Sequence, residues 1–179
     1  MLKKEDFSAI AKGYAVDIIA KLLESYDVEH YLVDIGGELR AKGHNAKGQT
    51  WTVGINVPSE TAEVTELQTA IPLKNRAIAT SGNYRNFYEV NGQKFSHTIN
   101  PDTGFPERSN LLSASVIAED CMVADAFDTA VMPMGLEKAF AMAQAMNDLE
   151  GYFIYSDENG NMAVKYTDGL KTLLKENEN

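Results

Sequence analysis

The segment ADAFDT at 124–129 carries three oxygen ligands at a spacing that suits a hard metal ion. Asp125, Asp128 and Thr129 stand at positions i, i+3 and i+4, so on a helix their side chains project from one face. Their neighbours are apolar, and two half-buried carboxylates without a partner are costly to desolvate. A divalent cation would remove their mutual repulsion, and carboxylate and hydroxyl oxygens suit Mg²⁺ or Ca²⁺ rather than a soft metal. The alternative is a solvated helix face whose threonine bonds back to its own backbone.

The segment ATSGNYRN at 79–86 is a second candidate site. Backbone amides and hydroxyls around Ser81 and Gly82 can bind a phosphate or the edge of a ring, and Tyr84 could stack on an aromatic ligand. The alternative is the start of a strand that needs glycine for its backbone geometry and buries its aromatic residues in the core.

His97 lies four residues before Pro101, where a predicted hairpin leads into the tight turn NPDTG. A histidine at this place could act as a general base or position a ligand. The alternative is a structural histidine that is held by hydrogen bonds.

A double glycine interrupts the strand-like segment VDIGGE at 33–38. It could be a turn that a ligand approaches closely, or only a bulge. It does not match GxGxxG, and Gly13 after Lys12 is no P-loop because the upstream glycine is absent. The two commonest nucleotide-binding signatures are therefore missing.

Helices and strands of several kinds must position these residues. Apolar residues at every fourth place predict an amphipathic helix over 8–26, on which Ile10, Tyr14, Ile18, Leu22 and Tyr26 recur. Asn91-Gly92 between two strand-like runs predicts a hairpin over 87–98. We expect further strands at 30–35, 38–43, 51–57, 67–73, 77–80, 111–118, 152–155 and 162–166, further helices at 122–132 and 136–146, and a polar, frayed tail from Thr172. This mixture predicts an α+β fold rather than a regular βαβ array.

Composition excludes several classes of protein. The 179 residues include 26 acidic and 16 basic ones, a formal charge of -10. This charge argues against binding to nucleic acid or to anionic lipid, so any phosphate ligand needs a local device such as a metal ion. The single cysteine, Cys121, excludes an intrachain disulfide, and no apolar run approaches the ~20 residues of a membrane span. The first residues do not resemble a signal peptide, and the compartment is not indicated.

Five ordered segments resemble the FAD:protein FMN transferase family, the ApbE-like flavin transferases. They are DFSAIAKGYAVD (6–17), YLVDIGGELRAKG (31–43), IATSGNYRNFY (78–88), FSHTINPDTGFP (95–106) and VADAFDTAVMPMG (123–135). The similarity runs from Asp6 to the strands near Tyr166. It implies one ApbE-like, T-fold-related domain over 1–179 with a largely antiparallel sheet and a disordered tail at about 175–179. It matches only the C-terminal portion of longer family members.

The resemblance also implies an activity. Members cleave the pyrophosphate of FAD in the presence of Mg²⁺, transfer FMN to a Thr or Ser hydroxyl of a target flavoprotein, and release AMP. Targets include subunits of membrane redox pumps, and members are typically exported to the periplasmic side of the membrane. Two alternatives stay open: an FAD pyrophosphatase without an acceptor protein, and a flavin- or metal-binding module that needs a partner chain. We also expect association, either with a second copy or with a partner that supplies the missing half.

The resemblance assigns roles to individual positions. The metal ligands it implies are Asp125, Asp128, Thr129 and the backbone carbonyl of Ala9, and His97 matches the histidine near the reacting phosphate. The positions it places at FAD are Asp6, Lys12 and Ile99, to which our reading of the Thr-Ser-Gly segment adds Ser81, Gly82 and Tyr84. Lys12 stands where some members have an acidic residue.

Overall fold

A six-stranded antiparallel sheet forms the centre of the protein. The computed structural model describes residues 7–57, 67–82, 87–90, 93–96 and 109–176. The sheet has the strand order β1-β2-β5-β8-β9-β10, and every neighbouring pair is antiparallel. Its strands are β1 (Tyr31–Ile35), β2 (Glu38–Lys42), β5 (Ala77–Gly82), β8 (Leu111–Ala118), β9 (Glu150–Ser156) and β10 (Met162–Tyr166). The predicted α+β fold with a largely antiparallel sheet is confirmed.

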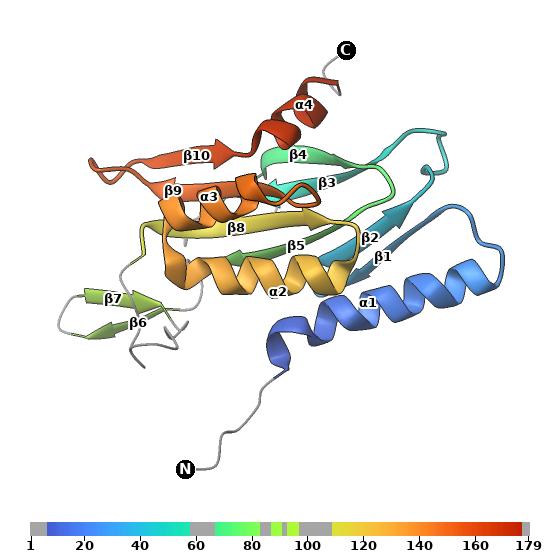
Figure 1. Ribbon diagram of the computed structural model, residues 1–179, viewed down its shortest axis with the longest axis horizontal. Helices are drawn as coiled ribbons and strands as arrows, with labels where there is room; N and C mark the ends of the chain where they lie inside the picture. Colours follow the sequence, from blue (N-terminus) through green and yellow to red (C-terminus); the bar gives the residue numbers. More distant parts are fainter. Residues whose placement is uncertain (1–6, 58–66, 83–86, 91–92, 97–108, 177–179) are drawn as a thin grey trace, which may run out of the picture.

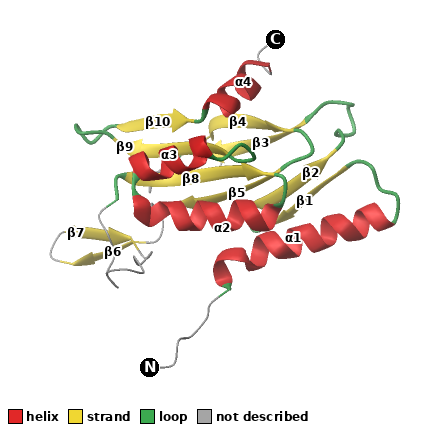
Figure 2. Ribbon diagram, viewed as in Figure 1, coloured by secondary structure: helices red, strands yellow, loops and turns green. Residues whose placement is uncertain are grey.

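Helices cover one face of this sheet (Figures 1 and 2). They are α1 (Ser8–Ser25), α2 (Cys121–Val131) and α3 (Leu136–Ala145), and the short 3₁₀ helix η1 (Met132–Met134) joins the last two. The other face packs against the hairpin of β3 (Trp51–Asn56) and β4 (Leu67–Leu73), and against α4 (Asp168–Glu176). A separate hairpin joins β6 (Phe87–Val90) to β7 (Gln93–Ser96).

Alternation along the central strands explains how both faces become buried. On β5, Ala77 and Ala79 belong to the clusters on the helical side, whereas Ile78 between them packs with β3, β4 and α4. On β8, Val116 faces the helices and Ile117 faces the opposite layer. Because side chains alternate along a strand, a nearly continuous apolar run is needed to fill two layers at once. The small alanines on the helical side let α2 approach the sheet.

The buried face of α1 is not the face that carries its largest apolar residues. The buried residues of α1 are Gly13, Val16, Asp17 and Ala20, which face α2 and β1. Four of the five apolar residues at every fourth place point outward, since Tyr14, Ile18, Leu22 and Tyr26 are 54%, 45%, 54% and 76% exposed, whereas Ile10 is half-buried. We call the four exposed residues the outer stripe. The periodicity identified the helix correctly, but small residues make the close contact with α2.

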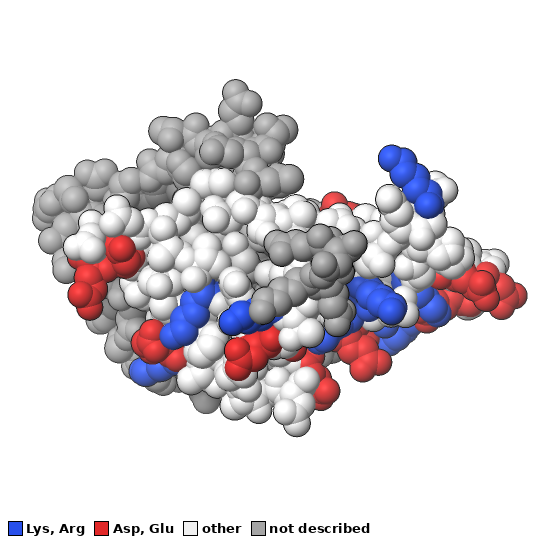
Figure 3. All heavy atoms as spheres, turned by 90° about the horizontal axis from the view of Figure 1, so that it is seen from above, with Lys and Arg blue, Asp and Glu red and all other residues white. Residues whose placement is uncertain are grey.

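Most of the remaining elements lie where the sequence predicts them, with small shifts at their ends, but α4 was not predicted. The sequence predicts a frayed tail from Thr172, but α4 continues to Glu176. The prediction is therefore wrong for residues 172–176. The turn Asn91-Gly92 and the turn NPDTG lie outside the described residues. No described helix combines the length and the apolar character that a bilayer crossing needs. On the face drawn in Figure 3, acidic and basic side chains of the described residues are interspersed.

Candidate metal centre

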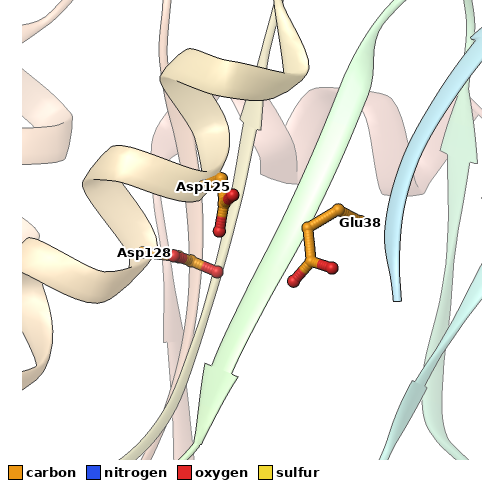
Figure 4. A group of neighbouring side chains, drawn as sticks. All are labelled: Glu38, Asp125 and Asp128. Atoms are coloured by element: carbon orange, nitrogen blue, oxygen red, sulfur yellow. The ribbon is translucent and has the colours of Figure 1, made fainter. Parts of the chain in front are cut away.

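Three buried carboxylates converge above β5 (Figure 4). Glu38 is the first residue of β2, and Asp125 and Asp128 lie one turn apart on α2. One carboxylate oxygen from each residue lies within 4.8 Å of the others. The three residues are only 3%, 3% and 1% exposed. The side chains of Asp125 and Asp128 therefore share one face, as their spacing predicted.

Gly13 sets the distance between α1 and α2. A Cβ at this position would lie 2.4 Å from the carbonyl oxygen of Cys121 and 2.8 Å from the Cβ of Asp125, so no larger residue fits without a shift of the backbone. The amide of Gly13 donates a hydrogen bond to Oδ2 of Asp125 over 2.8 Å. The close approach of the two helices thus fixes one of the carboxylates.

A second contact with α1 holds the first turn of α2. Asp17 accepts hydrogen bonds from the backbone amides of Cys121 at 3.0 Å and Met122 at 2.9 Å. Free amides and the positive end of the helix dipole favour a carboxylate at this place. Arg40 of β2 pairs with Asp17 at 2.6 Å and with Asp120 at 2.7 Å. Helix α2 is therefore anchored to both α1 and β2, one turn before Asp125.

The hairpin of β1 and β2 brings Glu38 to the centre. Gly36 and Gly37 form its turn with φ values of 65° and 101°, which L side chains rarely adopt. Ile35 pairs with Glu38 across this turn. Oε1 of Glu38 accepts a hydrogen bond from Nζ of Lys12 at 2.5 Å. The double glycine therefore belongs to a tight hairpin that delivers a carboxylate.

Two hydroxyl groups border the carboxylates. Thr129 donates its Oγ1 hydrogen to Oδ1 of Asp128 over 3.1 Å, and its Oγ1 lies 3.3 Å from Oγ of Ser81 near the end of β5. Gly82 follows in β5 and pairs with Ser113 of β8. The helix and the strand together present carboxylate and hydroxyl oxygens to one place.

The carboxylates of the centre have few partners among the described residues, both for their negative charge and for their hydrogen-bond acceptors. Within the described part of the chain, Oε2 of Glu38 and Oδ2 of Asp128 are buried and accept no hydrogen bond. Burial, and next the charge of Asp125, raises the pKa of Asp128 to about 8. Burial also raises the pKa of Glu38, against the effect of Lys12. A hard cation would neutralise these charges and occupy the free oxygens, so the donor set fits such an ion.

The predicted site residues fall into two groups. Asp125, Asp128, Thr129 and Ser81 lie together, with Gly82 next to them in β5, while Ala9 and Lys12 lie on the first turns of α1. Asp6, Tyr84, His97 and Ile99 lie outside the described residues. Sequence reasoning missed Glu38 as a member of the centre. The double glycine before it was the available signal, but nothing local indicated which segment it would face.

A comparison with protein families identifies the chain. Residues 3–153 match the model of the ApbE family. The chain belongs to the ApbE family. Among curated relatives, the FAD:protein FMN transferase of Haemophilus influenzae is 39% identical over 173 residues, which are 97% of this chain and 49% of the relative. The enzyme of the same name from Vibrio cholerae is 41% identical over 155 residues, 87% of this chain and 46% of the relative.

Solved structures of ApbE proteins share this fold. The flavin transferase ApbE from Vibrio cholerae superposes with a TM-score of 0.81 at 38% identity, covering 94% of this chain and 52% of the other. The apo flavinyl transferase ApbE of Pseudomonas stutzeri gives a TM-score of 0.82 at 34% identity, covering 96% and 52%. The chain thus spans about half the length of the relatives that it matches.

Proposed function

We propose that this chain forms the metal-binding half of an FAD:protein FMN transferase, which moves FMN from FAD to a Thr or Ser hydroxyl of a target flavoprotein and releases AMP. The observation that carries this proposal is the group of three buried carboxylates beside Thr129, in a chain of the ApbE family. The relatives named FAD:protein FMN transferase support the substrate and the type of reaction. By family resemblance, the acceptor is a flavoprotein such as a subunit of a redox pump.

In the proposed reaction the acceptor's hydroxyl oxygen forms a bond to the phosphorus of the FMN half of FAD. The bond between this phosphorus and the bridging oxygen breaks, and AMP leaves with that oxygen. His97, by family resemblance, takes the proton of the attacking hydroxyl or positions it. A bound Mg²⁺ supplies the positive charge that stabilises the diphosphate and the leaving group.

Asp125, Asp128 and Thr129 would hold this ion, together with the backbone carbonyl of Ala9. The contacts of Gly13 support the part assigned to Ala9. In a regular α-helix the amide of residue 13 donates to the carbonyl of residue 9, and here Oδ2 of Asp125 is a further acceptor of the Gly13 amide. With this second acceptor the Gly13 amide bonds less strongly to the Ala9 carbonyl. The carbonyl oxygen of Ala9 is then better able to serve as a metal ligand.

The FAD contacts that we propose surround these ligands. Ser81 and Gly82 lie near the end of β5 beside Thr129, where backbone and hydroxyl groups can meet a phosphate. Lys12 lies beside Glu38 at the edge of the same centre. The remaining contacts, Asp6, Tyr84 and Ile99, are proposed from the resemblance and from the residue types alone.

Incubation of the purified chain with FAD and Mg²⁺ tests this function, with AMP and FMN as the products measured. Products that form only with a Thr-bearing flavoprotein, together with a fluorescent flavoprotein band, support the transferase. Products without an acceptor indicate a pyrophosphatase instead. Asp125→Ala is expected to abolish the metal-dependent turnover, and unchanged turnover would remove Asp125 from the ligand set.

The outer stripe of α1 supports a further part of the proposal, that the chain acts together with more protein. Three exposed apolar residues at every fourth place of α1, followed by Tyr26 at its C-terminal cap, form an apolar patch that is typical of an interface. Because the relatives are about twice as long, we propose the unmatched part of such a transferase as the occupant, in the same or a separate polypeptide. Light scattering of the chain mixed with that part of the Vibrio cholerae enzyme is expected to show a complex. A homodimer, or a mixture of monomers, would contradict this assignment.

A further inference from the structure

Lys12 is a charged neighbour of the metal centre, and its proposed place among the FAD contacts does not say what it does to a bound metal ion. Its ammonium group lies 2.5 Å from Oε1 of Glu38. The Glu38 side chain is 4% exposed, whereas that of Lys12 is 50% exposed. In the described part of the chain this is the only ion pair that any of the three carboxylates makes. Lys12 therefore reaches from the surface to the edge of a buried acidic group.

Arg40, a second basic residue of the described part of the chain, is engaged with other carboxylates. The guanidinium group of Arg40, two residues after Glu38, donates to Asp17 and Asp120 at the start of α2. Among the described residues, three carboxylates and one ammonium group thus make up the charge of the centre, which is close to -2 when all of them are ionised. This value is equal and opposite to the charge of a divalent cation.

We propose that Lys12 sets the charge selectivity of the metal centre: by cancelling one carboxylate charge at Glu38, it matches the site to a divalent hard cation rather than a trivalent one. Two buried oxygens, one on Glu38 and one on Asp128, accept no hydrogen bond from the described residues, and this supports an ion between them. The inference rests on the proposed function, because it requires the metal centre to exist.

Coulomb's law predicts how much the loss of the Lys12 charge should change the binding of each ion. The repulsion between Lys12 and a bound ion is proportional to the charge of the ion. Removal of the ammonium charge must therefore strengthen the binding of a trivalent ion more than that of a divalent ion, in a ratio of about 3 to 2 on a logarithmic scale. If Mn²⁺ binds about tenfold more tightly, Tb³⁺ is expected to bind about 30-fold more tightly.

The experiment measures the binding of Mn²⁺ and Tb³⁺ to the full chain without FAD, by calorimetry and by terbium luminescence. Lys12→Met removes the charge and keeps a similar length and apolar stem. Lys21→Met removes the same charge from an exposed site on the same helix, about 13 Å along the axis and beyond the screening length of about 10 Å at 0.1 M salt. Lys12→Arg keeps the charge.

Lys12→Met is expected to tighten the binding of both ions and to favour Tb³⁺ about threefold over Mn²⁺, while Lys21→Met and Lys12→Arg keep the wild-type preference. Equal shifts for the two ions, weaker binding of both, or the same shift in Lys21→Met would overturn the role of Lys12. Failure of the wild-type chain to bind either ion would instead refute the metal centre, and with it the proposed function.

Discussion

Replacement of Asp128 by asparagine is expected to stabilise the metal-free protein while it abolishes metal binding. The Asp128 side chain is almost fully buried next to Asp125, and its pKa is raised from the ordinary 3.8 to about 8. Between these two values the folded chain holds a proton that the unfolded chain has released. The free energy of unfolding therefore falls as the pH rises from about 4 to about 8.

The size of this effect follows from the width of the interval. Each pKa unit corresponds to about 1.4 kcal/mol, so the group destabilises the folded chain by up to about 4 kcal/mol at pH 7. Asparagine has nearly the same shape and no charge to desolvate. The free energy of unfolding of Asp128→Asn should thus exceed that of the wild type. This difference should grow by up to about 3 kcal/mol between pH 5 and pH 7.5.

Urea unfolding followed by circular dichroism, in the presence of a chelator, measures this difference at several pH values. Asp148→Asn at an exposed position is the matched control for the loss of one negative charge. With saturating Mn²⁺ the order should reverse, because only the wild type gains stability from binding. Parallel pH dependence of the wild type and Asp128→Asn in chelator would refute the reasoning about the buried carboxylate.

Two further predictions concern the contacts that position α2. Gly13→Ala should lower the free energy of unfolding by about 1–3 kcal/mol and weaken Mn²⁺ binding, because the new methyl group overlaps the carbonyl of Cys121. Urea unfolding measures the first effect and calorimetry the second. An unchanged affinity for Mn²⁺ would contradict the prediction. Asp17→Ala should cost about 3 kcal/mol, since it leaves Arg40 and the amides at the start of α2 without a buried acceptor. The matched change Asp120→Ala removes a half-exposed partner of the same arginine and should cost less than about 1 kcal/mol; equal losses would show that Asp17 has no special role.

The parts of the site that depend on local spacing were predictable from the sequence. Asp125, Asp128 and Thr129 meet because residues three and four apart share a helix face. Glu38 joins them from a segment 87 residues before Asp125, through the register of a hairpin and the order of the strands. No local pattern contains that information, so the sequence indicated the turn but not its place in the centre.

The strands were predictable for the same reason, and the packing of α1 was not. Apolar strand-like runs and the turn residues between them located β1, β2 and β8 within one or two residues. On α1 the largest apolar residues, such as Leu22, point outward. Its inner face instead uses Gly13 and Ala20, because the closeness of two helices depends on small residues. The periodicity of the apolar residues therefore located the helix but did not indicate which of its faces is buried.

Because the Gly13 amide donates to Asp125, hydrogen exchange of this amide proton reports on the contact between α1 and α2 at the metal centre. That proton can exchange with solvent only when the two helices separate, an opening that also pulls a carboxylate out of the cluster. Its exchange rate in deuterated water would follow the integrity of the centre without any label, and occupation of the centre should slow it.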